Sequence, residues 1–137
     1  RGADRNNDPA ILAPLFAPDA TWGAKGFGPF RSRAAIADGL AATGRTGILW
    51  SLHYMISPLI DLAADGDAAT GSWYLWELAT MPGATAEEPE SVWVGGTYQA
   101  DFRRLDGRWY FQNVWLDIRL ATPFEEAWGG RPLRRFE

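Results

Sequence analysis

The sequence predicts an α+β domain in which helices pack on one side of a sheet of three or four long strands. Helical signals are confined to the first third of the chain, whereas β-branched and aromatic residues dominate the remainder. Helices followed by consecutive strands are typical of the α+β class. The chain has 137 residues, of which 47 % are apolar, so we expect one domain over residues 1–137 with one sizeable core.

The first helix is expected over residues 8–17. Asp8 can cap this helix, Pro9 fits its first position, and apolar residues recur on one of its faces. Pro14 lies inside the segment and is expected to kink or shorten the helix. An extended piece then leads into the glycine-rich stretch 23–30, which predicts a loop or a hairpin.

A second helix is expected over residues 33–43, with Ser32 as its N-cap and the stretch 43–47, which contains two glycines, as its end. Dense β-branched and aromatic segments then predict strands over residues 48–61, 68–80, 92–104 and 109–120. The tail over residues 121–137 is expected to lie on the surface.

Proline and glycine residues predict bulges and turns within and between the predicted strands. Pro58 predicts an edge strand or a bulge, because proline cannot donate to a sheet ladder. Gly95 and Gly96 predict a bulge, and the pair Asp106-Gly107 predicts a tight hairpin turn.

Charge and composition exclude several classes of protein. The formal net charge is −4, so electrostatic binding to nucleic acid is not expected. The chain has no cysteine and one histidine, so neither a disulfide nor a metal site is expected. No nucleotide-binding glycine motif occurs, and no cofactor is expected. No apolar run reaches the roughly 18 residues of a membrane span and no signal peptide is visible, which predicts a cytoplasmic protein without a membrane partner.

His53 is the first candidate for a catalytic group. It is the only histidine and lies in the middle of an apolar strand. Because histidine changes its charge near neutral pH, it suits the role of general base. A buried imidazole also needs a polar partner. A histidine with a purely structural role is an equal alternative.

Glu77 is the second candidate. Strand alternation puts it on the same face as Trp73, Leu75 and Ala79. A carboxyl group in such surroundings suits acid–base chemistry when it lines a cavity. The alternative is a glutamate at the end of a strand that points to solvent.

The last strand and the start of the chain supply further polar candidates. Alternation puts Asn113 on one face with Trp109, Phe111 and Trp115, and an amide among aromatic rings can orient a substrate oxygen. A core amide with satisfied hydrogen bonds is the alternative. Asp4, which precedes the first helix, is by its position alone a cap or a turn residue.

Four segments of the chain resemble the SnoaL-like family of the nuclear transport factor 2-like superfamily. They are LAPLFAPDATW, LHYMIS, DAATGSWYLWE and GGTYQADFRRLDGRWYF, of which the last is the most specific. The resemblance runs over residues 3–124, nearly the whole chain. The first helix of the family and a tyrosine of several members would precede Arg1.

The resemblance implies a cone, in which a strongly curved mixed sheet wraps around N-terminal helices and encloses an apolar pocket. The dehydratase and dehydrochlorinase members use a His–Asp pair, and the matching positions here are His53 and Asp4. A second acid of one dehydratase matches Glu77, where the family pattern has aspartate. A polar group of the last strand matches Asn113, with Arg119 as the other choice of register.

Together these features predict a cofactor-independent lyase of the dehydratase type, or an isomerase, that acts on an apolar cyclic molecule. His53 is expected to remove a proton from carbon, Asp4 to fix the imidazole tautomer, and Glu77 to assist the leaving group. Asn113 and Tyr98 are expected to orient a substrate oxygen. Two alternatives stay open: a non-catalytic module for small-molecule binding or dimerisation, and a protein of the polyketide-cyclase type.

The chain has eight tryptophans, an excess that predicts an aromatic pocket wall together with an interface. The side chains expected to bind substrate are Trp22, Trp73, Leu75, Tyr98, Asn113, Trp115 and Phe124. Aromatic residues on the outer face of an open sheet would be exposed to water unless another surface packs on them. We therefore expect a homo-oligomer, either a dimer or a trimer.

Overall fold

A short helical segment begins the part of the chain that the structure describes. The computed structural model describes residues 8–83, 88–126, 128–130, 132 and 133. Helix α1 (Pro9–Leu12) is capped by Asp8, whose carboxylate accepts a hydrogen bond of 2.9 Å from the backbone N–H of Ala10.

Pro14 shortens the predicted first helix. It lies in the 3-10 turn η2 (Ala13–Leu15), and the backbone is extended from Phe16 onward. The expected helical end of this segment is therefore wrong, because Phe16 and Ala17 already belong to the first strand.

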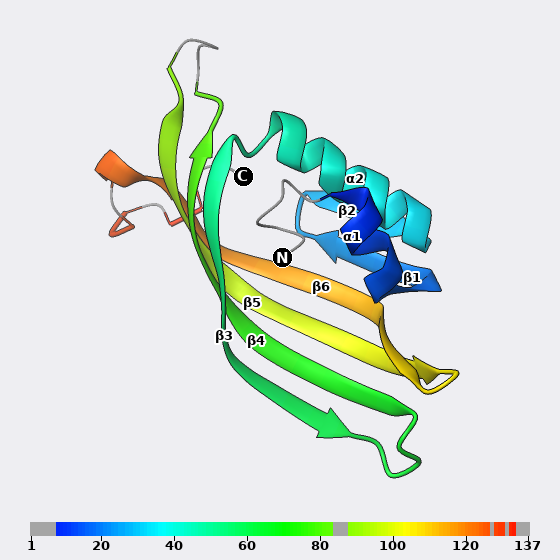
Figure 1. Ribbon diagram of the computed structural model, residues 1–137. Coiled ribbons are helices and arrows are strands. Elements are labelled where there is room, and N and C mark those ends of the chain that lie inside the picture. The colour runs from blue at the N-terminus through cyan, green and yellow to red at the C-terminus, as the bar shows by residue number, and fades with distance from the viewer. Residues whose placement is uncertain (1–7, 84–87, 127, 131, 134–137) are drawn as a thin grey trace.

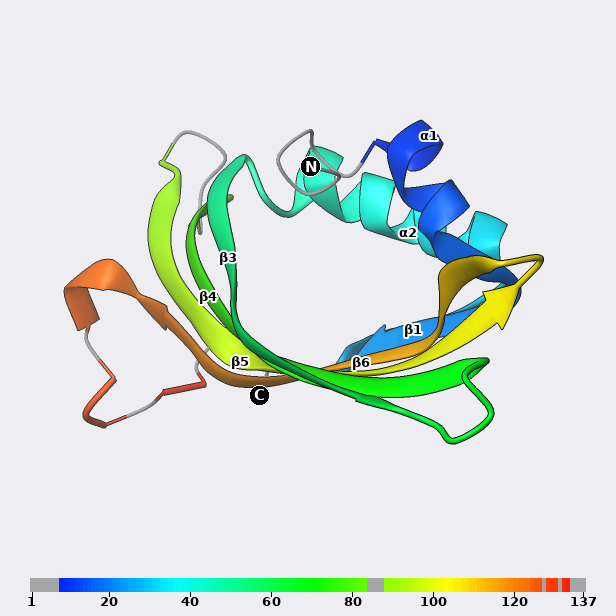
Figure 2. The ribbon, with the colours of Figure 1, turned by 60° about the horizontal axis from the view of Figure 1, so that its bottom comes forward.

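Six strands form one curved, mixed sheet. They are β1 (Phe16–Ala24), β2 (Phe27–Arg31), β3 (Trp50–Leu62), β4 (Ala68–Met81), β5 (Glu90–Leu105) and β6 (Arg108–Pro123). Their order in the sheet is β2-β1-β6-β5-β4-β3, in which β1 and β6 run parallel and all other neighbours run antiparallel. The sheet bends into a cup, and the helices lie over its concave side (Figures 1 and 2). The predicted α+β class and the curved mixed sheet are confirmed.

Helix α2 (Arg33–Thr46) lies across the open side of the cup (Figure 1). The hydroxyl of Ser32 caps it by accepting from the N–H of Ala35 at 3.3 Å. Its expected end was too early, since the helix continues through the buried Gly44 and stops at Gly47. A glycine costs a helix about 1 kcal/mol, and burial against the sheet outweighs this local preference.

The turn and bulge signals of the sequence correspond to observed irregularities. Asp106 and Gly107 both have positive φ, which is the geometry that a tight turn between β5 and β6 requires. The pairing of β3 with β4 shifts between Ile56 and Leu59, around Pro58, and β3 is an edge strand.

Two further bulges decide which face of β6 looks into the cup. Gln112 is an extra residue of β6, because Phe111 pairs with Phe102 and Asn113 pairs with Asp101. A second shift lies opposite Gly95 and Gly96, which confirms the predicted bulge. One extra residue moves every following side chain to the other face of a strand.

None of the helices in the described ranges is both long and apolar enough to cross a membrane.

Candidate functional site

A cavity of about 860 Å³ lies between the concave face of the sheet and the helices. Its wall is mainly aliphatic and aromatic, and the strands β3, β4 and β5 contribute its titratable side chains. Leu15, Leu49 and Trp50 belong to the wall but are exposed, so they mark its rim. A large apolar cavity with a few convergent polar groups is the usual form of a small-molecule site.

His53 and Glu77 form a pair on this wall. They are directly opposite each other in the antiparallel pairing of β3 with β4, so their side chains leave the same face of the sheet. Nδ1 of His53 lies 3.4 Å from Oε2 of Glu77. The two side chains are 14 % and 5 % exposed. The pairing of adjacent strands thus brings a base and an acid into contact away from bulk water.

Each member of this pair has one polar atom that makes no hydrogen bond in the described structure. Nε2 of His53 and Oε1 of Glu77 are buried and make no hydrogen bond within the described part of the chain. When Nδ1 of a neutral imidazole carries the hydrogen and directs it at the carboxylate, Nε2 keeps a lone pair. The arrangement can therefore accept a proton at Nε2 while Glu77 stabilises the resulting imidazolium.

Tyr98 lies beside the pair, on β5. Its ring centroid is 6.3 Å from that of His53, and it stacks on Trp73 at 5.4 Å with an angle of 20° between the rings. Burial raises the pKa of Tyr98, and the negative charge of Glu77 raises it further. The phenol therefore stays protonated and acts as a hydrogen-bond donor.

The sequence predicted several of these positions. His53, Glu77, Trp22, Trp73, Leu75 and Tyr98 all lie in the cavity wall, as expected. Asp4, the other expected member of a His–Asp pair, lies outside the described residues.

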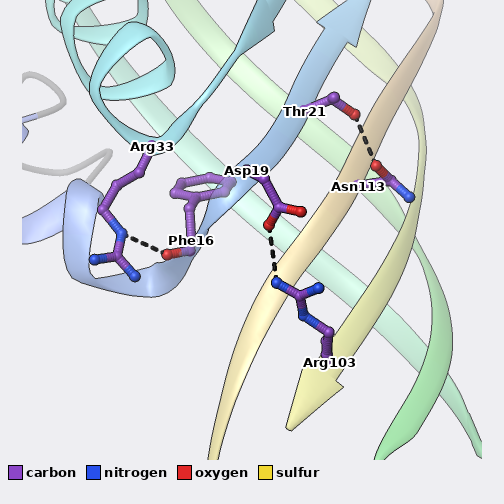
Figure 3. Close-up of polar contacts among 6 residues, drawn as sticks. All are labelled: Phe16, Asp19, Thr21, Arg33, Arg103 and Asn113. Carbon is purple, nitrogen blue, oxygen red and sulfur yellow. Dashed lines mark hydrogen bonds and ion pairs between the residues drawn. The ribbon is translucent and has the colours of Figure 1, made fainter. Parts of the chain in front are cut away.

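Asn113 and Trp115 do not line this cavity, so their expected places were wrong. The bulge at Gln112 turns both to the outer face, where they line a separate groove of about 460 Å³. Asn113 is held there by two neighbours, since it accepts from the hydroxyl of Thr21 at 2.9 Å (Figure 3) and donates to Asp101 at 2.8 Å. Arg119, the other register choice, is exposed at the second bulge and also lies outside the wall.

The expected place of Phe124 in the cavity wall was also wrong. The chain leaves the sheet after β6, and the 3-10 turn η3 (Phe124–Glu126) points away from the helices (Figure 2). The ring of Phe124 stacks on Trp93 at 5.7 Å, and Trp93 also contacts Trp76 and Trp128 on the outside of the cup. Phe124 thus belongs to an outer aromatic cluster rather than to the cavity.

Sequence reasoning missed other wall residues. Met55 follows His53 by two positions on β3, so simple alternation was enough to find it, and its sulfur accepts a hydrogen bond of 2.9 Å from Nε1 of Trp73. Phe111 was assigned to the face of Asn113, and only the bulge separates the two. Helix α2 adds Leu40, Thr43 and Gly44 to the opposite wall.

No group of three or more His, Cys, Asp or Glu side chains in the described segments is arranged to hold a metal ion.

Helix α2 is fixed over the cavity by Arg33, whose Nε donates a hydrogen bond of 2.7 Å to the carbonyl oxygen of Phe16 (Figure 3).

Comparison with known families agrees with this geometry. A family model described as a SnoaL-like domain matches residues 1–114. The chain belongs to the SnoaL-like family. None of the curated protein sequences matches it.

Solved structures share the fold of this SnoaL-like chain at low sequence identity. The crystal structure of LinA matches with a TM-score of 0.81 and 18 % identity, over 92 % of this chain and 82 % of that one. A hexachlorocyclohexane dehydrochlorinase from Novosphingobium barchaimii matches with a TM-score of 0.74 and 19 % identity, over 92 % and 82 %. A protein named after scytalone dehydratase, from Novosphingobium aromaticivorans, matches with a TM-score of 0.75 and 20 % identity, over 90 % and 78 %.

Proposed function

We propose that this SnoaL-like protein is a cofactor-independent lyase of the dehydratase type, or an isomerase, that takes a proton from carbon of an apolar cyclic molecule. The observation that carries the proposal is the contact of 3.4 Å between His53 and Glu77 on the wall of an apolar cavity. Removal of a proton next to a carbonyl or a leaving group can be driven by placement and desolvation alone. Such a reaction requires no cofactor.

His53 is the proposed base. Its Nε2 has no hydrogen bond within the described residues and is the proposed proton acceptor. Glu77 fixes the tautomer through its contact with Nδ1 and stabilises the imidazolium. Once Nε2 of His53 has taken the proton from carbon, the imidazolium passes its Nδ1 proton to the Glu77 carboxylate, and Glu77 is the proposed group that returns this proton to the product or to the leaving group; its Oε1 has no hydrogen bond within the described residues. Asp4, which the family resemblance pairs with His53, remains a proposed alternative to Glu77 as the partner of Nδ1.

The names of two structural relatives support an elimination. A dehydrochlorinase removes hydrogen chloride and a dehydratase removes water, and both reactions leave a double bond. Both proteins are under 25 % identical to this chain, so they support the reaction class and leave the substrate open.

The test is the substitution His53→Gln, which keeps much of the side-chain volume and removes the base. Elimination is measured on two substrates: hexachlorocyclohexane, by release of chloride, and an aryl β-hydroxy ketone, by absorbance of the conjugated product. For the substrate that the wild type accepts, we expect a loss of about 10²–10⁴-fold in kcat.

Tyr54→Phe is the matched control, because Tyr54 is the next residue on β3 and is exposed. It should retain wild-type turnover. A His53→Gln variant that keeps turnover would refute the base assignment. A wild type that binds apolar rings but converts neither substrate would favour the binding-module alternative.

We also propose that the partner of this chain is a second copy of it. Six large apolar residues on the outside of the sheet are between 41 % and 62 % exposed, and we name them the outer patch: Leu52, Tyr54, Ile56, Leu59, Tyr74 and Trp115. An apolar surface that extends over several strands marks an interaction site. A dimer and a trimer are both compatible with it.

A further inference from the structure

Three arginine side chains gather at the end of the sheet where β5 turns into β6. Arg103 and Tyr110 are directly opposite each other in the pairing of these strands, so their side chains leave the same face. Arg108 precedes Tyr110 by two positions on β6 and therefore shares that face. Arg33, the first residue of helix α2, reaches the same tyrosine ring from the helix layer.

The ring of Tyr110 contacts two guanidinium groups at once. The guanidinium carbon of Arg33 lies 5.6 Å from the ring centroid, and that of Arg108 lies 5.4 Å from it. Each contact is a cation–π interaction, which contributes about 0.5–1 kcal/mol at an exposed site. The two like charges also repel each other, and an anion that lies between them would turn this repulsion into attraction.

Neither of these two guanidinium groups has a counterion in the described structure. Among the described residues, no carboxylate lies within ion-pair distance of Arg33 or Arg108. Asp19, which lies at the same end of the sheet, is already paired with Arg103 at 2.8 Å (Figure 3). The described residues therefore leave two positive charges beside Tyr110 without a negative partner.

Arg33 is also held in place before a ligand arrives. Its Nε donates a hydrogen bond of 2.7 Å to the carbonyl oxygen of Phe16 (Figure 3), and its guanidinium group rests on the ring of Tyr110. A guanidinium group has five N–H groups, and within the described residues only the Nε–H of Arg33 has an acceptor. Its two terminal nitrogens thus form a fixed fork, whose shape fits the oxygens of a phosphate group.

We propose that Arg33 and Arg108 bind the phosphate group of a ligand beside Tyr110, at a site separate from the cavity. None of these three residues belongs to the cavity wall, so the site goes beyond the proposed elimination and does not depend on it. Two guanidinium groups match the two charges of a phosphate dianion, whereas a carboxylate carries only one. The formal net charge of −4 opposes a long polyanion, so the ligand carries a single phosphate group rather than a nucleic-acid backbone.

The test is isothermal titration calorimetry of the full chain with inorganic phosphate, at an ionic strength that sodium chloride keeps constant. We expect the wild type to bind phosphate at one site per chain. Arg108→Gln removes one of the two guanidinium groups and should weaken binding about tenfold or more, as the loss of a charge-assisted hydrogen bond does. Arg108 is exposed, and its printed contact among the described residues is with the ring of Tyr110, so the variant should fold.

Arg104→Gln is the matched control. Arg104 is exposed on the same hairpin but is directly opposite Trp109, so its side chain leaves the other face. This variant loses the same charge and should bind phosphate as the wild type does. His53→Gln should also bind phosphate normally, because His53 lies in the cavity wall. Failure of the proposed elimination and failure of the phosphate site are therefore distinguishable.

Phenyl phosphate separates the two sources from which the phosphate group could come. Tighter binding of phenyl phosphate than of inorganic phosphate would support the site and identify its ligand as a phosphate ester. Equal affinities would support the site and show that it recognises the phosphate group alone.

Three results would overturn the inference. If neither inorganic phosphate nor phenyl phosphate binds at millimolar concentration, the arginine cluster is not a phosphate site. If Arg104→Gln weakens binding as much as Arg108→Gln does, the attraction comes from net charge and not from this site. If acetate binds as tightly as phosphate, the cluster does not select a dianion.

Discussion

His53 and Glu77 place two buried polar atoms in an apolar wall without a hydrogen bond in the described structure. Each buried atom of this kind costs about 1–3 kcal/mol, and apolar residues at both positions would avoid the cost. A fold retains such groups where they act on something, so titratable residues in a cleft are candidates for function. The sequence pointed to both residues, because a lone histidine and a glutamate interrupt otherwise apolar strands.

Tyr98 leads to a prediction about alkaline stability. Burial, and to a lesser extent Glu77, raises the pKa of Tyr98 in the native state, whereas the unfolded chain has the ordinary value of about 10. Above about pH 10 the native protein keeps a proton that the unfolded chain releases, so the free energy of unfolding falls as pH rises. At about pH 11 the raised pKa of Tyr98 alone should make the free energy of unfolding about 1.4 kcal/mol lower than at neutral pH.

Urea unfolding at about pH 8 and about pH 11 measures this effect. Tyr98→Phe should lose about 1.4 kcal/mol less than the wild type between the two conditions. Tyr110→Phe, on β6 outside both the cavity wall and the outer patch, should follow the wild type. An identical pH dependence in Tyr98→Phe and the wild type would contradict the raised pKa.

Among the elements, the two bulges of β6 determine which residues meet at the cavity. Turn chemistry is local, so the pair Asp106-Gly107 was readable from the sequence. The extra residue at Gln112 depends on how β6 pairs with both β5 and β1, and no local signal marks it. This is why the cavity contains Phe111 while Asn113 and Trp115 lie outside.

Gly96 allows the second bulge, which leads to a prediction about its substitution. A β-carbon on Gly96 would overlap the backbone carbonyl oxygen of Asp117, and a backbone atom cannot move aside as a side chain can. Gly96→Ala should therefore lower the free energy of unfolding by about 2–3 kcal/mol, the usual effect of overpacking.

Gly95→Ala is the control for this prediction. Its β-carbon would lie 3.5 Å from that of Leu120, an ordinary contact, so its effect should stay within about 1 kcal/mol. The measurement is the midpoint of urea unfolding for both variants. Equal midpoints for Gly96→Ala and Gly95→Ala would show that the bulge can relax.

At the scale of the whole molecule, the cup divides the aromatic residues into two sets. Trp22 and Trp73 line the cavity, whereas Trp93 and Trp115 lie outside it. Composition predicted a wall and an interface but not the membership of each set. That division follows from strand pairing across the whole sheet, which sequence periodicity alone does not determine.

The outer patch leads to the last prediction, because water contacts it in a single chain and a second copy would remove it from water. Ile56 and Tyr74 are directly opposite each other on β3 and β4. Replacing them together by Ile56→Lys and Tyr74→Glu keeps an attractive cross-strand pair but makes burial of the patch costly. The wild type should sediment at two or three times the chain mass of 15.2 kDa, and the double variant as a single chain.

The control pair is Ile60→Lys with Leu62→Glu, since these residues are as exposed but alternate with the patch along β3. A monomeric wild type, or a control pair that dissociates as readily as the patch variant, would show that this face is not the interface.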